Sequence, residues 1–155
     1  MPDIIMPVTG KNSFRIRHYD IRHITPLFPF GYGLSYSRFR LSGLKISQKT
    51  IAAGDTLEIY VTLKNVGKYE GKETVQLYIA DLRCTYPRPL RELKAFQKVG
   101  LAPGESCRIC FRISRKELSF YDPVYGGWKA EPGEFKVYVG TSSRDLPLCK
   151  SFYLK

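Results

Sequence analysis

The sequence lacks the features that mark a membrane protein or a common catalytic class. No stretch approaches the roughly 18 consecutive apolar residues of a membrane span, and residues 1–12 carry no basic segment followed by an apolar one. No signal peptide is therefore predicted. The nucleophile motif GxSxG and the phosphate-loop motifs GxxxxGK and GxGxxG are also absent. These absences exclude the serine hydrolases and nucleotide-binding proteins that depend on such motifs.

Metal ligands are few and poorly placed. The two histidines, His18 and His23, lie in a segment without periodicity. Cys107 and Cys110 have a CxxC spacing, but apolar and polar residues alternate through 107–113, which places the two thiols on opposite faces of a strand. The remaining thiols are Cys84 and Cys149. We predict no metal site and no cofactor, and four free thiols without a signal peptide favour a cytoplasmic location.

Helical periodicity is also absent, apart from one turn that a capping box predicts at 114–117. From residue 38 onward, short runs of alternating polarity are separated by turn residues. These runs predict strands over 39–46, 57–64, 74–79, 93–101, 107–113, 128–131, 135–139 and 145–154. Residues 65–71 are interpreted as a hairpin-type loop. Seven to eight short strands predict an all-β fold, an antiparallel β-sandwich with Greek-key connections; a small closed barrel is the alternative.

The charge is strongly unbalanced but dispersed. The chain has 25 Lys and Arg against 14 Asp and Glu, a formal net charge of +11. Both signs are interleaved, no run of five like charges occurs, and no recognition helix accompanies the charge. We therefore predict neither nucleic acid nor membrane as a partner, and an acidic polymer remains an alternative.

Acidic residues do not indicate a catalytic pair. They lie mostly in turns or at outward strand positions, and only Asp81 and Asp122 have aromatic surroundings. Glycoside cleavage needs two carboxyl groups close in space, and these two residues fit turn capping equally well. The chain alone is not predicted to be an enzyme.

Aromatic residues outside the predicted core could stack on sugars. The candidates are Tyr60 and Tyr78 at outward strand positions, and Tyr69, Tyr86, Tyr121, Tyr125 and Trp128 in loops. Most tyrosines of a sandwich are packing residues with a solvated hydroxyl. Packing is therefore the preferred interpretation, with weak glycan contact as the alternative.

The first 37 residues form an arm, and residues 38–155 form the predicted sandwich. The arm ends in the uncharged aromatic stretch LFPFGYGLSY, residues 27–36. Large apolar patches are rarely left open to water. We predict a docking strip for another domain, consisting of Phe28, Phe30, Tyr32 and Tyr36, with Gly31 and Gly33 supplying the turn that leads to the first strand.

Five segments resemble one known family in order and spacing. They are PLFPFGYGLSYS (26–37), VTLKNVGKYEGKETVQLYIAD (61–81), RPLRELKAFQKVGLAPGES (88–106), RKELSFYD (115–122) and EPGEFKVYVGTSSRDLPL (131–148). Together they resemble the C-terminal fibronectin type III-like domain of glycoside hydrolase family 3 enzymes and the end of the linker before it. The resemblance implies an immunoglobulin-like or fibronectin-like sandwich, and a parent that is a β-glucosidase or β-xylosidase. The family's catalytic motifs match no residue here.

The predicted function is a non-catalytic accessory domain that docks on the catalytic domains of a parent glycosidase and stabilises them. In the loop 81–91, which Pro87 and Pro89 stiffen, Arg88 and Arg91 are the candidates to pair with carboxylates of that neighbour. The alternatives are a free-standing carbohydrate-binding module and a self-standing protein-interaction module. The sequence leaves the oligomeric state and the sugar specificity of the parent open.

Overall fold

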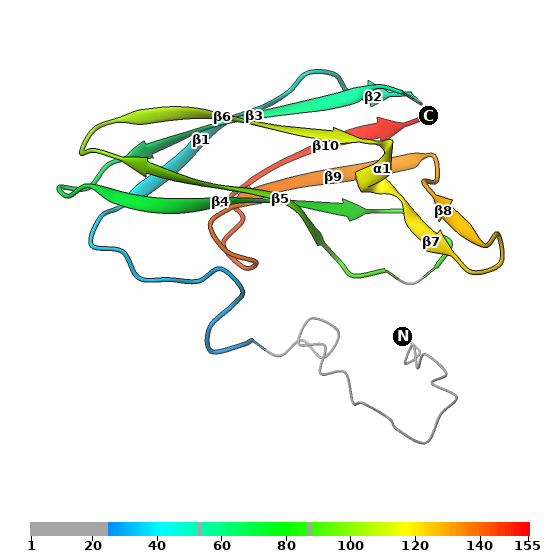
Figure 1. The fold of residues 1–155 in the computed structure, drawn as a ribbon, viewed down its shortest axis with the longest axis horizontal. Helices are drawn as coiled ribbons and strands as arrows, with labels where there is room; N and C mark the ends of the chain where they lie inside the picture. Colours follow the sequence, from blue (N-terminus) through cyan, green and yellow to red (C-terminus); the bar gives the residue numbers. More distant parts are fainter. Residues whose placement is uncertain (1–24, 53, 87) are drawn as a thin grey trace.

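The computed structural model describes residues 25–52, 54–86 and 88–155, and two β-sheets make up most of it (Figure 1). His18, His23 and Pro87 lie outside the described residues. One sheet has the order β1 (Phe39–Ile46), β3 (Thr56–Asn65), β6 (Ser106–Ser114). The other has the order β2 (Thr50–Ile51), β10 (Leu148–Leu154), β9 (Gly133–Gly140), β4 (Gly71–Asp81), β5 (Glu92–Leu101). The predicted all-β sandwich is confirmed, with additional short strands.

Alternating polarity builds the core as predicted. In β3, Leu57, Ile59, Val61 and Leu63 are fully buried between the sheets, and β6 contributes every second residue from Ile109 to Ile113. β3 pairs with β6 along its whole length in antiparallel register. Cys107 packs against the core whereas Cys110 is exposed, so the two thiols lie on opposite faces of β6 as expected.

The interior strand β4, which lies between β9 and the edge strand β5, is more deeply buried than its sequence pattern predicts. Tyr78 was expected to point outward as a sugar-stacking candidate, but only 6% of its surface is exposed. Gln76 is also buried, so β4 is covered on both faces over residues 75–80. The sequence pattern describes only the face toward the opposite sheet. On the outer face, Gly31 lies against Gln76, and Gln76 Nε2 donates to the carbonyl oxygen of Thr141, so residues distant in sequence cover this position.

The loop between β3 and β4 is not a hairpin, which corrects the prediction for residues 65–71. β3 lies in one sheet and β4 in the other, so the loop crosses between the sheets. The connection from β5 to β6 crosses beside it. Asn65 holds these crossings together: its Nδ2 donates to the carbonyl oxygens of Leu101 (3.0 Å) and Tyr69 (2.8 Å), and its Oδ1 accepts from Gly67 N (2.9 Å).

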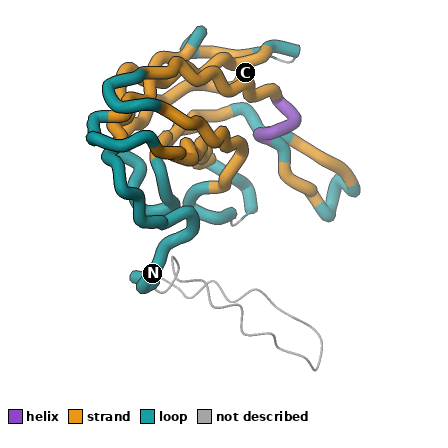
Figure 2. Tube along the Cα trace, turned by 60° about the vertical axis from the view of Figure 1, so that its left-hand side comes forward, coloured by secondary structure: helices purple, strands orange, loops and turns teal. Residues whose placement is uncertain are grey.

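A small hairpin stands apart from the sandwich at one end (Figures 1 and 2). It consists of β7 (Phe120–Asp122) and β8 (Gly127–Lys129), which pair only with each other. The predicted strand over 128–131 is therefore a strand of this hairpin. The helical turn α1 (Arg115–Leu118) leads into β7 and carries the predicted capping box between Ser114 and Glu117. Among the described residues, no helix has the length and apolar character needed to cross a bilayer.

Substituting Asn65→Ala tests the importance of the crossing. The change leaves the buried carbonyl oxygen of Leu101 and the partly buried one of Tyr69 without their donor, so we expect the free energy of unfolding to fall by about 2–3 kcal/mol. Chemical denaturation measures this difference. Thr62→Ala, on the outer face of the same strand, is the control and should change stability by no more than about 0.5 kcal/mol. Equal effects of the two substitutions would contradict the proposed importance of Asn65.

Candidate docking surface

The arm lies directly on the outer face of the five-stranded sheet at Gly31. This residue has a φ of +81°, and a Cβ atom added to it would lie 1.8 Å from Gln76 Nε2. The adjoining turn is closed by Tyr32 N, which donates to the carbonyl oxygen of Pro29 at 2.9 Å. Glycine meets both requirements, since it adopts positive φ without strain and allows the backbone to approach the sheet closely.

Hydrogen bonds hold the contact between the arm and the sheet in place. Ser143 N donates to the carbonyl oxygen of Phe30 at 2.8 Å, which connects the arm to the segment after β9. Gln76 Nε2 donates to the carbonyl oxygen of Thr141 at 3.0 Å, and the Tyr78 hydroxyl donates to Gln76 Oε1 at 2.6 Å. The buried polar groups beneath the arm are therefore paired with one another, and the arm rests on a defined surface.

A second anchor follows at Ser37, which is 7% exposed. Its hydroxyl donates to Asn65 Oδ1 at 2.6 Å. Val66 N donates to the carbonyl oxygen of Arg38 at 2.8 Å, and Gly67 lies so close that an added Cβ would be 2.1 Å from Ser37 Oγ. The backbone of the arm is thus held at both ends of the stretch from residue 30 to residue 37.

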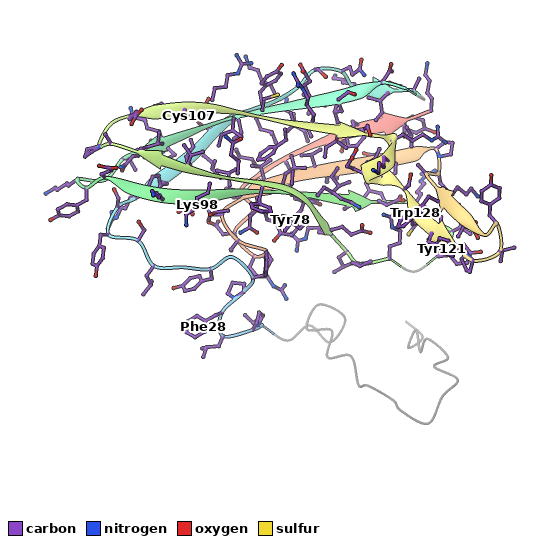
Figure 3. All side chains as sticks on the ribbon, viewed as in Figure 1. Phe28, Tyr78, Lys98, Cys107, Tyr121 and Trp128 are labelled. Carbon is purple, nitrogen blue, oxygen red and sulfur yellow. The ribbon has the colours of Figure 1, made fainter. Side chains whose placement is uncertain are left out.

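The aromatic side chains of the predicted docking strip nevertheless point into solvent. Their exposed fractions are 68% for Phe28, 67% for Phe30, 51% for Tyr32 and 97% for Tyr36. The rings of Phe28 and Tyr32 pack against each other with centroids 5.7 Å apart (Figure 3). Exposed aromatic side chains on a fixed backbone are typical of a protein–protein interface.

Sequence analysis missed a neighbouring group of apolar residues on β5 and just before it. Phe96 is 68% exposed and pairs across the strands with Gln76, the residue beneath Gly31. Leu90 and Leu93 are also exposed. The alternation of inward and outward side chains along β5 is broken by a register shift opposite Leu77 and Tyr78. The sequence pattern therefore does not separate inward from outward positions in this part of β5. The available signal is the occurrence of large apolar side chains on an edge strand.

Arg88 is held inside its own domain. Its Nη1 lies 3.0 Å from Asp81 Oδ2 and its Nη2 2.9 Å from Glu92 Oε1. Its guanidinium also lies 5.3 Å from the ring centre of Phe120. These contacts fix the loop 81–91, and they occupy the guanidinium that was expected to reach a neighbouring carboxylate.

The guanidinium of Arg91 lies 5.3 Å from the ring centre of Tyr138, on the outer face of the five-stranded sheet. Among the described residues, Arg88 pairs with two carboxylates whereas Arg91 forms no ion pair. Its position beside the exposed Leu90 and Leu93 adds a positive charge to the apolar surface.

The carboxylates with aromatic surroundings are already engaged in structural contacts. The backbone N–H of Tyr125, 3.1 Å from Asp122 Oδ1, is the main cause that lowers the pKa of Asp122, and Val124 N, at 2.9 Å, contributes. Asp81 accepts from Arg88. Among the described residues, no group of three or more His, Cys, Asp or Glu is placed to hold a metal ion.

Removing Arg88 should destabilise the domain. The Asp81 side chain is only 4% exposed, so Arg88→Ala leaves a buried carboxylate without its cation, and we expect a loss of about 3 kcal/mol. Arg112→Ala is the matched control, because Arg112 pairs with Glu58 but is 73% exposed, and its loss should change stability by about 0.5 kcal/mol. Thermal and urea unfolding of both variants provide the comparison, and similar losses would refute the internal role of Arg88.

The same cluster predicts a pH dependence. Burial tends to raise the pKa of Glu92, but hydrogen bonds and charges from Lys94 and Arg88 outweigh it and leave this pKa below its ordinary value. Ionised Glu92 therefore stabilises the fold above its unfolded pKa of about 4.3, and this contribution is lost as the pH falls through the folded pKa.

Glu92→Gln removes that contribution at every pH. The stability difference between the unmodified chain and this variant should therefore narrow between about pH 6 and about pH 3. Urea denaturation across this range measures the difference, with Glu70→Gln at an exposed position as the control. A difference that stays constant or widens toward low pH would contradict the assigned ion pairs.

Comparison with known proteins gives consistent matches. The model of the fibronectin type III-like domain family matches residues 73–143. The thermostable β-glucosidase B of Acetivibrio thermocellus is 42% identical over 87% of this chain, and a putative β-xylosidase of Formosa agariphila is 44% identical over 84%. These matches span 18% and 17% of the two relatives.

Solved structures agree. The Bifidobacterium adolescentis GH3 β-glucosidase superposes with a TM-score of 0.82 at 35% identity, covering 89% of this chain and 20% of that one. This chain therefore corresponds to about one fifth of the length of each of these proteins.

Proposed function

This chain belongs to the fibronectin type III-like domains of glycoside hydrolase family 3 enzymes, and from that premise we propose that it is a non-catalytic accessory domain of a glycosidase. It docks on the catalytic domains of the parent through the arm and stabilises them. The parent acts on β-linked glucosides or xylosides, as the names of the relatives suggest.

The observation that carries this proposal is the exposed docking strip on an anchored backbone. Gly31 and Ser37 fix the arm on the sandwich, while Tyr36 remains 97% exposed. An unanchored segment would lose much conformational entropy on binding, and this arm has already lost part of it. The relatives' additional length, about four fifths of each protein, supplies a partner of suitable size.

The engaged carboxylates support a role without catalysis. Asp81 is paired with Arg88, and the lowered pKa of Asp122 favours the ionised, turn-holding form. A glycosidase acid requires a raised pKa at a group that can reach the scissile oxygen. We therefore expect no turnover of aryl β-glucosides or β-xylosides by the isolated chain.

A chimera tests the docking strip. This chain replaces the matching segment of the Acetivibrio thermocellus β-glucosidase, and a variant carries serine at Phe28, Phe30, Tyr32 and Tyr36. Since these rings are exposed in the isolated chain, we expect the quadruple change to alter its Tm by less than about 2 °C. In the chimera, lost apolar burial should lower the Tm by about 5 °C or more and reduce β-glucosidase activity.

Two results would contradict the proposal. One is an equal Tm change in the isolated chain and in the chimera, because it would place the effect within the sandwich. The other is an unaffected chimera. Tyr153→Ser serves as the control, since Tyr153 is 48% exposed on β10, outside the strip.

A further inference from the structure

The structure reduces the aromatic candidates for sugar contact to one cluster. Tyr78 is buried, Tyr60 is covered by the guanidinium of Arg108 at 4.3 Å from its ring centre, and Tyr86 packs against Phe120. Tyr69 stands alone in the loop between β3 and β4. The remaining three, Tyr121, Tyr125 and Trp128, belong to the β7–β8 hairpin and its turn, and we call them the hairpin cluster. Figure 3 shows two of them, Tyr121 and Trp128, on the hairpin.

The hairpin cluster is open to solvent. The exposed fractions are 56% for Tyr121, 74% for Tyr125 and 73% for Trp128. Tyr121 and Trp128 face each other across the strand pair, with ring centroids 6.1 Å apart at an interplanar angle of 80°. The two rings therefore pack edge to face, and this contact limits the freedom of the indole.

The turn holds Tyr125 in place. Asp122 Oδ1 accepts from Val124 N and Tyr125 N, and Gly126 N donates to the Asp122 carbonyl oxygen at 2.8 Å. Gly127 lies against the Tyr125 ring, since an added Cβ would be 3.2 Å from Cε1 of that ring. A two-stranded hairpin is marginal in water by itself, and these contacts give the exposed rings a fixed arrangement.

A hollow of about 570 Å³ adjoins the rings. Its lining combines two aromatic side chains with polar groups: Tyr125, Trp128, Arg115, Lys116, Ser119 and Lys129. Ligand sites of this volume typically combine apolar walls with a few hydrogen-bonding groups. Sugars have a matching character, because their C–H faces are apolar and their hydroxyl groups both donate and accept hydrogen bonds.

Three basic side chains, Arg115, Lys116 and Lys129, line the hollow, and none of the described residues in its lining is acidic. Residues 115–131 contain three basic and three acidic side chains: Arg115, Lys116 and Lys129, and Glu117, Asp122 and Glu131. Lys129 lies 3.3 Å from Glu131 and 3.9 Å from Asp122. Arg115 Nη2 also donates to the carbonyl oxygen of Ala130 at 2.9 Å, so two of the three cations that line the hollow are engaged within the domain.

We propose that the hairpin cluster binds an oligosaccharide, whose β linkage rests on the substrate class proposed above for the parent. The sugar lies with its C–H faces on Trp128 and Tyr125, while polar groups of Lys116 and Ser119 contact its hydroxyl groups. The hairpin lies at the opposite end of the sandwich from the junction of the arm with β1 (Figure 1). The site therefore does not depend on the docking proposed for the arm, and either can fail without the other.

Trp128 provides a direct test, because it is the sole tryptophan of the chain. Cello- and laminari-oligosaccharides are titrated into the chain, and its tryptophan fluorescence is recorded. We expect a saturable change with a millimolar or tighter Kd, since exposed shallow sites bind small ligands weakly. Tyr125→Ala retains the fluorophore and should weaken binding about tenfold.

Calorimetry supplies the measurement for Trp128→Ala, which should abolish binding, and circular dichroism checks that each variant is folded. Tyr153→Ala is the control and should bind as the unmodified chain does. Absence of a saturable signal at millimolar oligosaccharide overturns the proposal, as does unchanged binding by both hairpin variants. If no glycan binds but Tyr125→Ala lowers the Tm of the chimera, the hairpin contacts protein and the proposal is wrong.

Discussion

The contact between Gly31 and Gln76 determines how the arm is presented. Without a Cβ atom, Gly31 lies directly on the amide of Gln76, and that amide is held by Thr141 and Tyr78. A bulkier residue would lift the arm from the sheet and change the direction of the rings that follow. The orientation of the aromatic strip therefore depends on polar groups buried in the interior strand β4, although the strip itself makes few contacts with the sandwich.

The two exposed aromatic surfaces, the docking strip and the hairpin cluster, differ in what surrounds their rings. At the arm, anchored backbone presents apolar rings that have no counterpart in the described part of the chain, which suits a protein interface. At the hairpin, aromatic rings adjoin a hollow that is lined by several hydrogen-bonding groups, which suits a sugar. Position in the fold supports this division, because the two surfaces lie at different ends of the sandwich (Figures 1 and 2).

The sequence predicted the sandwich well because alternating residues in strands such as β3 and β6 directly reflect burial between two sheets. For Tyr78 the sequence favoured packing but left sugar stacking open, and only the structure shows that this outward position is 6% exposed. The sequence failed for residues 65–71, since turn chemistry is similar whether a loop joins paired strands or crosses between sheets. Arg88 shows a third limit: its partners Asp81 and Glu92 are near in sequence, but their convergence depends on the path of the loop.

The central claim is that the arm presents its rings to the rest of a glycosidase. Hydroxyl-radical footprinting of Tyr32 and Tyr36, in the isolated chain and in the chimera with the Acetivibrio thermocellus enzyme, tests it most directly. The account predicts that both tyrosines react readily in the isolated chain and become about tenfold less reactive in the chimera, whereas Tyr153 reacts equally in both. Equal reactivity of Tyr32 and Tyr36 in the two proteins would contradict the claim.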